Sequence, residues 1–344
     1  MAESADVDLY DTFAQLPDER ISQELLEWFK KSNEVKIFIT GKTGVGKSTL
    51  VNGLVGKQVA KEGDSLDPET SIVKDYKCKH RSVYVTVWDS PGLQDGTNKE
   101  GKYLEDMKKK CSDVDLSIYC VDFKETRFFP NCPDILAMKK LTKLFGEKMW
   151  ENAMFVLTFA NLAEDLDSKI LEADEDEEKA RLFQNKVELW KRALADALIA
   201  DVGVDKEVAE RIEVVPAGHE SIPALLDRPH WLSPIWFAAL YAMHPRAQPA
   251  MLKLNRHRIV DNPKQIRDED LKKFIDQQPL IFSQRGALIG EKYGESELGQ
   301  AIGCTMGSHA SVDLKVALQI RNTVTELAKR YGQAFIDMIR DIFS

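Results

Sequence analysis

The sequence predicts an α/β fold in which helices cover a mostly parallel β-sheet with one antiparallel strand, followed by a helical C-terminal region. Short apolar runs alternate with charged helical runs from about residue 34 onward, which is the pattern of a parallel sheet with helical connections. Two extended runs lie close enough in the chain to form a hairpin. After Pro223 the composition changes to proline, tryptophan and long helical stretches.

Six runs are expected to form the strands of this sheet. Five of them are rich in apolar and β-branched residues and lie at 35–40, 83–88, 116–123, 154–158 and 212–215. Only Lys79 to Ser82 separate the sixth run, at 72–78, from the run that begins at Val83. A hairpin at this point would place one antiparallel strand in the sheet.

The chain is expected to have three parts: an N-terminal extension at 1–33, a main domain at 34–225 and a helical region at 226–344. The extension contains an amphipathic run at 21–29, which suits a short helix lying on the main domain. In the helical region, the segment 286–307 has glycines at 286, 290, 294, 299, 303 and 307. On a helix this spacing lets another backbone approach closely. The segment is interpreted as a tight helical hairpin or loop, or else as an element whose insertion depends on a membrane or an oligomer.

Composition narrows the possible compartments and partners. The net charge is −9, with 56 acidic and 47 basic residues, which argues against a nucleic-acid-binding face. The N-terminus lacks the basic and apolar regions of a signal peptide, and no apolar run is long enough to span a bilayer. The five cysteines show no metal-binding spacing. A cytoplasmic protein is expected, either free or peripheral to a membrane.

The strongest motif is a phosphate-binding loop. The sequence GKTGVGKS follows a β-branched strand and precedes a helical run, as such a loop requires. Its glycines let backbone N–H groups turn toward a phosphate at the N-terminus of the helix. Lys47 is expected to bridge the β- and γ-phosphates and Ser48 to ligate Mg²⁺. The expected nucleotide contacts are Gly41, Lys42, Thr43, Gly44, Val45, Gly46, Lys47, Ser48 and Thr49.

A second motif completes the predicted magnesium site. The strand at 83–88 runs into Asp89-Ser90-Pro91-Gly92, a DxxG sequence at the carboxyl end of a strand. Asp89 is expected to hold Mg²⁺ through a water, and the Gly92 amide to contact the γ-phosphate. Thr70, between the two motifs, is the candidate switch threonine and third metal ligand. Together these motifs specify a P-loop NTPase G domain.

Recognition of the base is harder to predict. The usual guanine-reading sequence [NT]KxD is replaced by Thr158-Phe159-Ala160-Asn161, which lacks both the lysine and the aspartate. The Asn161 amide has one acceptor oxygen, whereas guanine offers two donors on this edge, so Glu164 or Asp165 is a candidate second acceptor. Phe159 is a candidate to stack on the base. After the strand at 212–215, Ala217 and Gly218 are expected to offer a backbone N–H to guanine O6.

The order GKTGVGKS, DSPGL and LFGEKMWENAMFVLT with no following KxD resembles a known family. It is similar to the septin-like (TRAFAC) AIG-type G domains of the immunity-associated nucleotide-binding (GIMAP/IAN) proteins and of the chloroplast import-receptor (Toc) GTPases, over about residues 35–218. The resemblance implies a switch that binds GTP and GDP with Mg²⁺, hydrolyses GTP slowly, forms dimers or higher oligomers when GTP-bound, and often works at membranes. It also implies that Arg127 points into the site of a facing protomer.

Catalysis by a lone monomer is expected to be slow. Leu93 stands where many switch GTPases have the glutamine that orients the attacking water. Gln94 is a candidate substitute, and Arg127 supplied across a dimer is a candidate to stabilise the transition state. The four candidate catalytic residues are therefore Lys47, Thr70, Gln94 and Arg127.

Two alternatives remain open from the sequence. Lys42 lies where ATPases of the deviant-Walker class carry a lysine that reaches across a dimer interface. An antiparallel hairpin partner for the Asp89 strand would favour the switch-GTPase topology over that class. The other alternative is a scaffold that binds the nucleotide without turnover and uses its helical region to bind partners.

Overall fold

The computed structural model describes residues 18–56, 60, 72–93, 100–125, 130–219, 221–261 and 266–331. The chain divides into two compact units, one formed by 33–254 and the other by 1–32 together with 255–344. This division differs from the three-part division predicted from the sequence. Residues 226–254 group with the sheet, and the N-terminal segment groups with the C-terminal helices.

The unit 33–254 is built on a six-stranded sheet with the strand order β2-β3-β1-β4-β5-β6. Strand β2 pairs antiparallel with β3, and the other neighbouring strands pair in parallel. The α/β fold class and the single antiparallel strand predicted from the hairpin are therefore confirmed. The strands are β1 (Glu34–Gly41), β2 (Lys74–His80), β3 (Val83–Asp89), β4 (Leu116–Asp122), β5 (Ala153–Thr158) and β6 (Glu213–Pro216).

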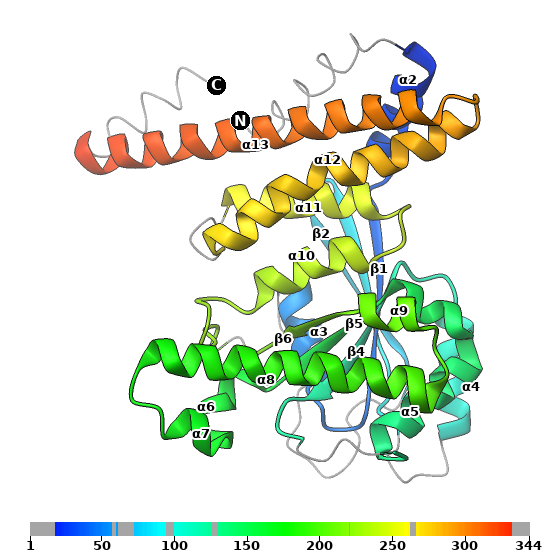
Figure 1. Cartoon of the computed structure of the whole chain (residues 1–344), viewed down its shortest axis with the longest axis vertical. Helices are drawn as coiled ribbons and strands as arrows, with labels where there is room; N and C mark the ends of the chain where they lie inside the picture. Colours follow the sequence, from blue (N-terminus) through cyan, green and yellow to red (C-terminus); the bar gives the residue numbers. More distant parts are fainter. Residues whose placement is uncertain are drawn as a thin grey trace. The chain divides into compact units, whose positions relative to one another are not determined.

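Helices lie on both sides of this sheet (Figure 1). The central strands β4 and β5 are apolar almost throughout and buried, as expected for strands covered on both faces. The helices of this unit are α3 (Lys47–Val55), α4 (Glu100–Lys110), α5 (Pro133–Phe145), α6 (Ala163–Leu166), α7 (Ser168–Leu171), α8 (Asp176–Ala197), α9 (Lys206–Arg211) and α10 (Leu232–Ala242), with short helices η1 (Glu147–Asn152), η2 (Ala160–Leu162) and η3 (Leu198–Val202). Helix α11 (Gln248–Asp261) begins in this unit and ends in the other.

The register of the strands brings the predicted motifs to one edge of the sheet. Ile39, at the end of β1, pairs with Asp89, and Leu157, at the end of β5, pairs with Pro216. Because parallel strands share a direction, their carboxyl ends meet at the same edge, where ligands of open α/β sheets bind. The phosphate loop, Asp89 and the segments that follow β5 and β6 therefore lie at one end of the unit.

The helical unit combines α2 (Glu19–Lys31) with α12 (Asp268–Glu291) and α13 (Ser296–Tyr331). Trp28 and Phe29 both pack against Phe282, with ring centroids 5.5 and 5.6 Å apart. Glu24 accepts a hydrogen bond from Lys292 at 2.7 Å. The sequence suggested that this N-terminal helix lies on the main domain, and this stays a prediction. Its aromatic face packs against Phe282 of α12.

The repeated glycines lie where α12 and α13 meet. A Cβ atom on Gly286 would overlap the carbonyl oxygen of Gly299, and one on Gly303 would overlap that of Phe282. The glycines therefore permit backbone-to-backbone packing, in the helical hairpin that was one of the two interpretations of this segment. Among the residues that the structure describes, no helix combines the length and apolar content that a membrane span requires.

Candidate functional site

The phosphate loop connects β1 to α3. Strand β1 ends at Gly41, and α3 begins at Lys47 with Gly46 as its N-cap. Gly46 has φ 76°, a left-handed conformation that favours glycine, and the ring of Phe159 leaves little room for a side chain there. The loop thus directs its backbone toward the N-terminus of a helix, where partial positive charge favours an anion.

Lys47 is buried at the centre of this loop. Its Nζ donates to the carbonyl oxygens of Lys42 at 2.7 Å and Gly41 at 3.4 Å. Burial lowers the pKa of the Lys47 ammonium, while the nearby charge of Asp89 acts in the opposite direction. A buried ammonium held by carbonyl oxygens is a favourable partner for an anionic ligand, because a second negative charge would offset its desolvation.

Ser48 and Asp89 meet beside Lys47. The Ser48 hydroxyl donates to Asp89 Oδ2 at 3.1 Å, and Asp89 is fully buried at the end of β3. A hydroxyl and a single carboxylate are the kind of sparse protein ligand set with which Mg²⁺ binds when phosphate oxygens and waters complete its shell. The structure therefore brings together two of the three predicted metal ligands.

The loop after β3 is joined to the phosphate loop through the backbone. The Thr43 N–H donates to the Leu93 carbonyl at 3.3 Å, and the Leu93 N–H donates to the Gly41 carbonyl at 3.1 Å. A Cβ on Gly92 would overlap Thr43, so only glycine allows this approach. The two loops are thus held together by these backbone hydrogen bonds. Leu93 is fully buried, so its side chain orients no water.

These residues fit a magnesium–triphosphate group. A Cβ added to Gly44 would meet no atom within 4 Å, so the backbone of the loop faces open space at that point. The hydroxyls of Thr40 and Ser90, which are next in sequence to Gly41 and Asp89, are buried and have no hydrogen-bond partner among the described residues. Buried polar atoms of this kind are usually satisfied, so their presence beside the loop is typical of a polar binding site.

Lys42 has a partner within its own chain. Its Nζ lies 2.8 Å from Asp134 Oδ2 and 3.4 Å from Glu125 Oε2, and the Asp134 side chain is only 1% exposed. Burial raises the pKa of Asp134, and the hydrogen bond from Lys42 opposes that rise. The Tyr119 hydroxyl donates to the other Asp134 oxygen at 3.1 Å. A signature lysine that reaches across a dimer would need to be available, so this pairing and the antiparallel β2–β3 hairpin both disfavour the deviant-Walker alternative.

The segment after β5 lies next to the phosphate loop. Thr158 donates its hydroxyl to the Val121 carbonyl at 3.0 Å, so this side chain has a structural bond. Phe159 has φ 58°, and an edge of its ring lies against Gly46. The Lys124 ammonium lies 4.4 Å from the centre of the Phe159 ring. This lysine therefore covers one face of the Phe159 ring.

Two expected base contacts are already engaged in other bonds. The Ala217 N–H donates to the Leu157 carbonyl and its own carbonyl accepts from the Ala160 N–H, both at 2.8 Å. Because the Ala217 N–H already bonds to Leu157, the expectation that it meets guanine O6 is corrected. Gly218 is the remaining candidate. Glu164, a proposed second acceptor, forms a short ion pair with Lys179.

Three predicted catalytic residues, Thr70, Gln94 and Arg127, lie outside the described residues. Their roles stay predictions.

Sequence reasoning missed Trp231. Its buried indole ring lies against Gly53 of α3 and against Gly218, and its Nε1 donates to the His219 carbonyl at 3.3 Å. It therefore ties the helix of the phosphate loop to the segment after β6. No sequence motif predicts this role, because the contact joins segments that are far apart in the sequence.

Comparisons with known proteins agree with this geometry. A family model described as a 50S ribosome-binding GTPase matches residues 36–159. Translocase of chloroplast 90 from Arabidopsis thaliana is 31% identical over 132 residues, which are 36% of this chain and 16% of that protein. Translocase of chloroplast 34 from Pisum sativum is 30% identical over 160 residues, which are 44% of this chain and 49% of that protein. The matches thus span less than half of either relative's own length.

A solved structure shares the fold. It comes from work on dimerization and the GTPase activity of the chloroplast translocon components Toc33 and Toc159, and it matches with a TM-score of 0.51 and 21% identity. The match covers 66% of this chain and 91% of that chain. A likeness at this identity supports the fold alone. Together with the family model over residues 36–159 and the phosphate-loop geometry, it leads to one conclusion: the unit 33–254 has the fold of a P-loop GTPase domain.

Proposed function

We propose that this chain is a GTP-binding switch protein that hydrolyses GTP slowly and is activated when a second copy assembles on its G domain. The observation that carries the proposal is the meeting of the Lys47 ammonium, the Ser48 hydroxyl and the Asp89 carboxylate at the carboxyl end of the sheet. When bound, Mg²⁺ would neutralise charge on the phosphates. Lys47 would hold the β- and γ-phosphate oxygens, and Ser48 and Asp89 would position the metal.

The buried Leu93 supports slow turnover by a monomer. In switch GTPases a polar side chain after the DxxG glycine orients the attacking water, and Leu93 is apolar and directed into the protein. Gln94 is the proposed substitute within the chain. Arg127, from a facing copy, is the proposed source of positive charge in the transition state. A solved relative whose study links dimerization to the GTPase activity of Toc33 and Toc159 supports this assembly-dependent arrangement.

The test is a hydrolysis assay with GTP and Mg²⁺ over a wide range of protein concentration. The specific activity is expected to rise with concentration in the native protein, to be lost in Lys47→Ala, and to lose its concentration dependence in Arg127→Ala. Arg211→Ala, an exposed arginine at the end of α9, is the matched control and should behave as the native protein. An Arg127→Ala protein with unchanged, concentration-dependent turnover would remove this arginine from the mechanism.

A nucleotide-binding scaffold without turnover is the second candidate, and the apolar residue after Gly92 is the feature that favours it. Tight nucleotide binding with no hydrolysis at any protein concentration would establish this scaffold. Measurable hydrolysis that depends on Lys47 would exclude it.

We also propose that the chain associates with membranes peripherally rather than by a span. Its relatives include proteins named translocases of chloroplast, and no described helix can cross a bilayer. Flotation of the native protein with anionic vesicles, with GDP and with a non-hydrolysable GTP analogue, tests this part of the proposal. Absence of vesicle-bound protein in both nucleotide states would contradict it.

A further inference from the structure

We infer that the base site of this chain does not select the 2-amino group of guanine, and that it accepts 6-oxopurine nucleotides as a class, including those of xanthosine and inosine. The inference rests on the proposed nucleotide-binding function and specifies its substrate class. It is carried by the Asn161 amide and by its position beside Gly218.

The structure places Asn161 at the end of the sheet beside Gly218. A Cβ added to Gly218 would lie 3.0 Å from Asn161 Cβ and 3.3 Å from Asn161 Oδ1, so the amide lies directly against this glycine. Phe159, two residues before Asn161, touches Gly46 of the phosphate loop. Asn161 and Gly218 thus lie together at the carboxyl edge of the sheet, in segments next to the phosphate loop.

The Asn161 amide is available to a ligand. Its side chain is half-buried, and it makes no hydrogen bond with any residue that the structure describes. The N–H of Gly218 likewise has no acceptor within the described part of the chain. Gly218 therefore offers its backbone N–H as a donor at this edge. Asn161 offers Oδ1 as an acceptor and Nδ2 as a donor.

These groups match a 6-oxopurine but not the specific pattern of guanine. The Gly218 N–H can donate to the 6-oxo group, whereas the 6-amino group of adenine would meet it donor to donor. Asn161 Oδ1 can accept from the purine N1–H. Guanine then places its 2-amino donor against the Asn161 Nδ2 donor, while xanthine places a 2-oxo acceptor there and hypoxanthine only a C–H. The amide therefore complements xanthine on both atoms.

Two described acceptors near this edge already have partners. The Glu164 carboxylate is ion-paired with Lys179, and the Ala217 carbonyl accepts from Ala160. Asp165 has a side chain outside the described set, so it enters the test as a separate variant.

The experiment is a competition of GTP, XTP, ITP and ATP against a fluorescent GTP analogue on the full chain with Mg²⁺. In the native protein XTP and ITP are expected to bind within about tenfold of GTP, since one hydrogen bond corresponds to about that factor, while ATP binds at least about tenfold more weakly than all three. Asn161→Asp supplies a second acceptor and should raise the ratio of GTP to XTP affinity by about a hundredfold or more. Such a gain for GTP cannot arise from damage to the fold.

Several outcomes would overturn the inference. If the native protein binds GTP more than about a hundredfold tighter than both ITP and XTP, its base site recognises the 2-amino group, which contradicts the inference. An unchanged GTP-to-XTP ratio in Asn161→Asp would show that Asn161 does not face this group. Loss of a GTP preference in Asp165→Asn would assign the reading to Asp165. These results would leave the proposed function intact, whereas a folded native protein that binds none of the four nucleotides would overturn both.

Discussion

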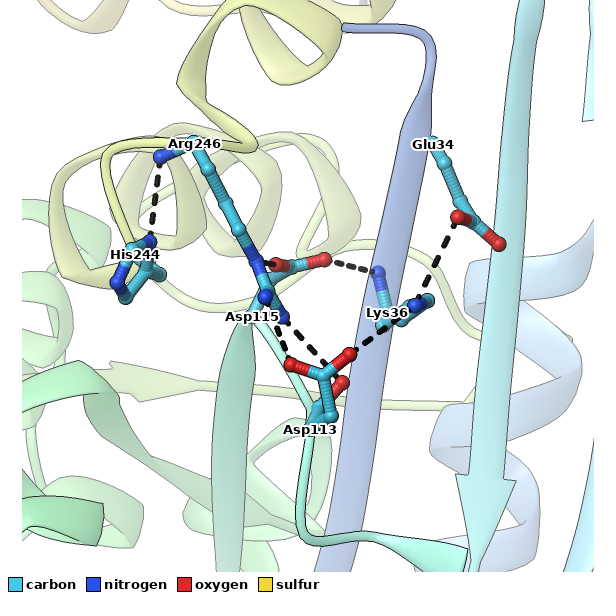
Figure 2. Close-up of polar contacts among 6 residues, drawn as sticks. All are labelled: Glu34, Lys36, Asp113, Asp115, His244 and Arg246. Carbon is cyan, nitrogen blue, oxygen red and sulfur yellow. Dashed lines mark hydrogen bonds and ion pairs between the residues drawn. The ribbon is translucent and has the colours of Figure 1, made fainter.

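The two ends of the central sheet differ in how their polar side chains find partners. At the carboxyl end, the buried Lys47 ammonium is held by two backbone carbonyl oxygens, and the Thr40 and Ser90 hydroxyls have no partner among the described residues. At the amino end, the charged side chains are paired with one another (Figure 2). The first arrangement leaves described polar groups without a partner, whereas the second pairs them with one another.

The pairing at the amino end centres on Asp115, which is nearly buried before β4. One oxygen of its carboxylate accepts from Arg246 Nε at 2.6 Å, and the other accepts from the Lys36 N–H at 2.8 Å. Arg246 also contacts Asp113 at 2.7 Å, and its backbone N–H donates to His244 Nδ1 at 3.2 Å (Figure 2). These bonds fasten the segment between α10 and α11 to the starts of β1 and β4. A cluster whose polar groups are all paired indicates a structural role. The two ends therefore show that buried polar groups with few partners distinguish a candidate binding site from a structural hydrogen-bond network.

The Lys42–Asp134 pair tests the comparison most severely, because it is a satisfied buried pair at the ligand end. Lys42→Met should lower the free energy of unfolding by about 3 kcal/mol, since it leaves the Asp134 carboxylate buried without its cation. Adding Asp134→Leu should restore most of that loss. Urea unfolding of the two single variants and the double variant measures the coupling. Equal stability of native and Lys42→Met proteins would show that the pair contributes nothing.

Lys47→Met should separate binding from stability. Nucleotide affinity should fall by about a hundredfold, because a charge-assisted contact to phosphate is lost. The free energy of unfolding should stay the same or rise, since the substitution removes a buried ammonium whose pKa is lowered by burial. Titration calorimetry and urea unfolding measure the two effects. A large loss of stability would show that Lys47 stabilises the fold. The difference proposed between the two ends of the sheet would then not hold.

Arg246→Met should show the reverse pattern. The free energy of unfolding should fall by about 2 kcal/mol, because the substitution leaves Asp115 without its charged donor, while nucleotide affinity should not change. Arg181→Met, on the exposed face of α8, is the control and should leave both quantities unchanged. A weakened nucleotide affinity in Arg246→Met would mean that the two ends of the sheet are coupled.

The smallest expected effect is in the acid range. The hydrogen bond from Arg246 lowers the pKa of Asp113 below its ordinary value of 3.8. A lowered pKa in the folded state means that this stabilisation is present above about pH 3.8 and is lost as the pH falls through the folded value. Asp113→Asn should therefore be slightly less stable than the native protein at neutral pH and equal to it in strong acid. A stability difference that persists in strong acid would assign the effect to packing.

The sequence by itself determined the fold class and the residues of the loop between β1 and α3. The strand predicted at 83–88 is observed at Val83–Asp89, and the hairpin partner predicted at 72–78 is observed at Lys74–His80. These strand predictions succeeded because the burial patterns of strands are local. The loop could be located because it is a run of consecutive residues with a characteristic spacing of glycines and lysine.

Only the tertiary structure decided which polar groups are available for a ligand. Asp134 pairs with Lys42 across 92 residues of sequence, and the Ala217 N–H is taken by Leu157, so neither fact can be read from spacing along the chain. The partner of the N-terminal helix α2 was also undetermined, since an amphipathic face shows that it must be covered but not by what. Hydrogen-bond partners and packing surfaces are set by segments that folding brings together, and these pairings separate the binding end of this sheet from its structural end.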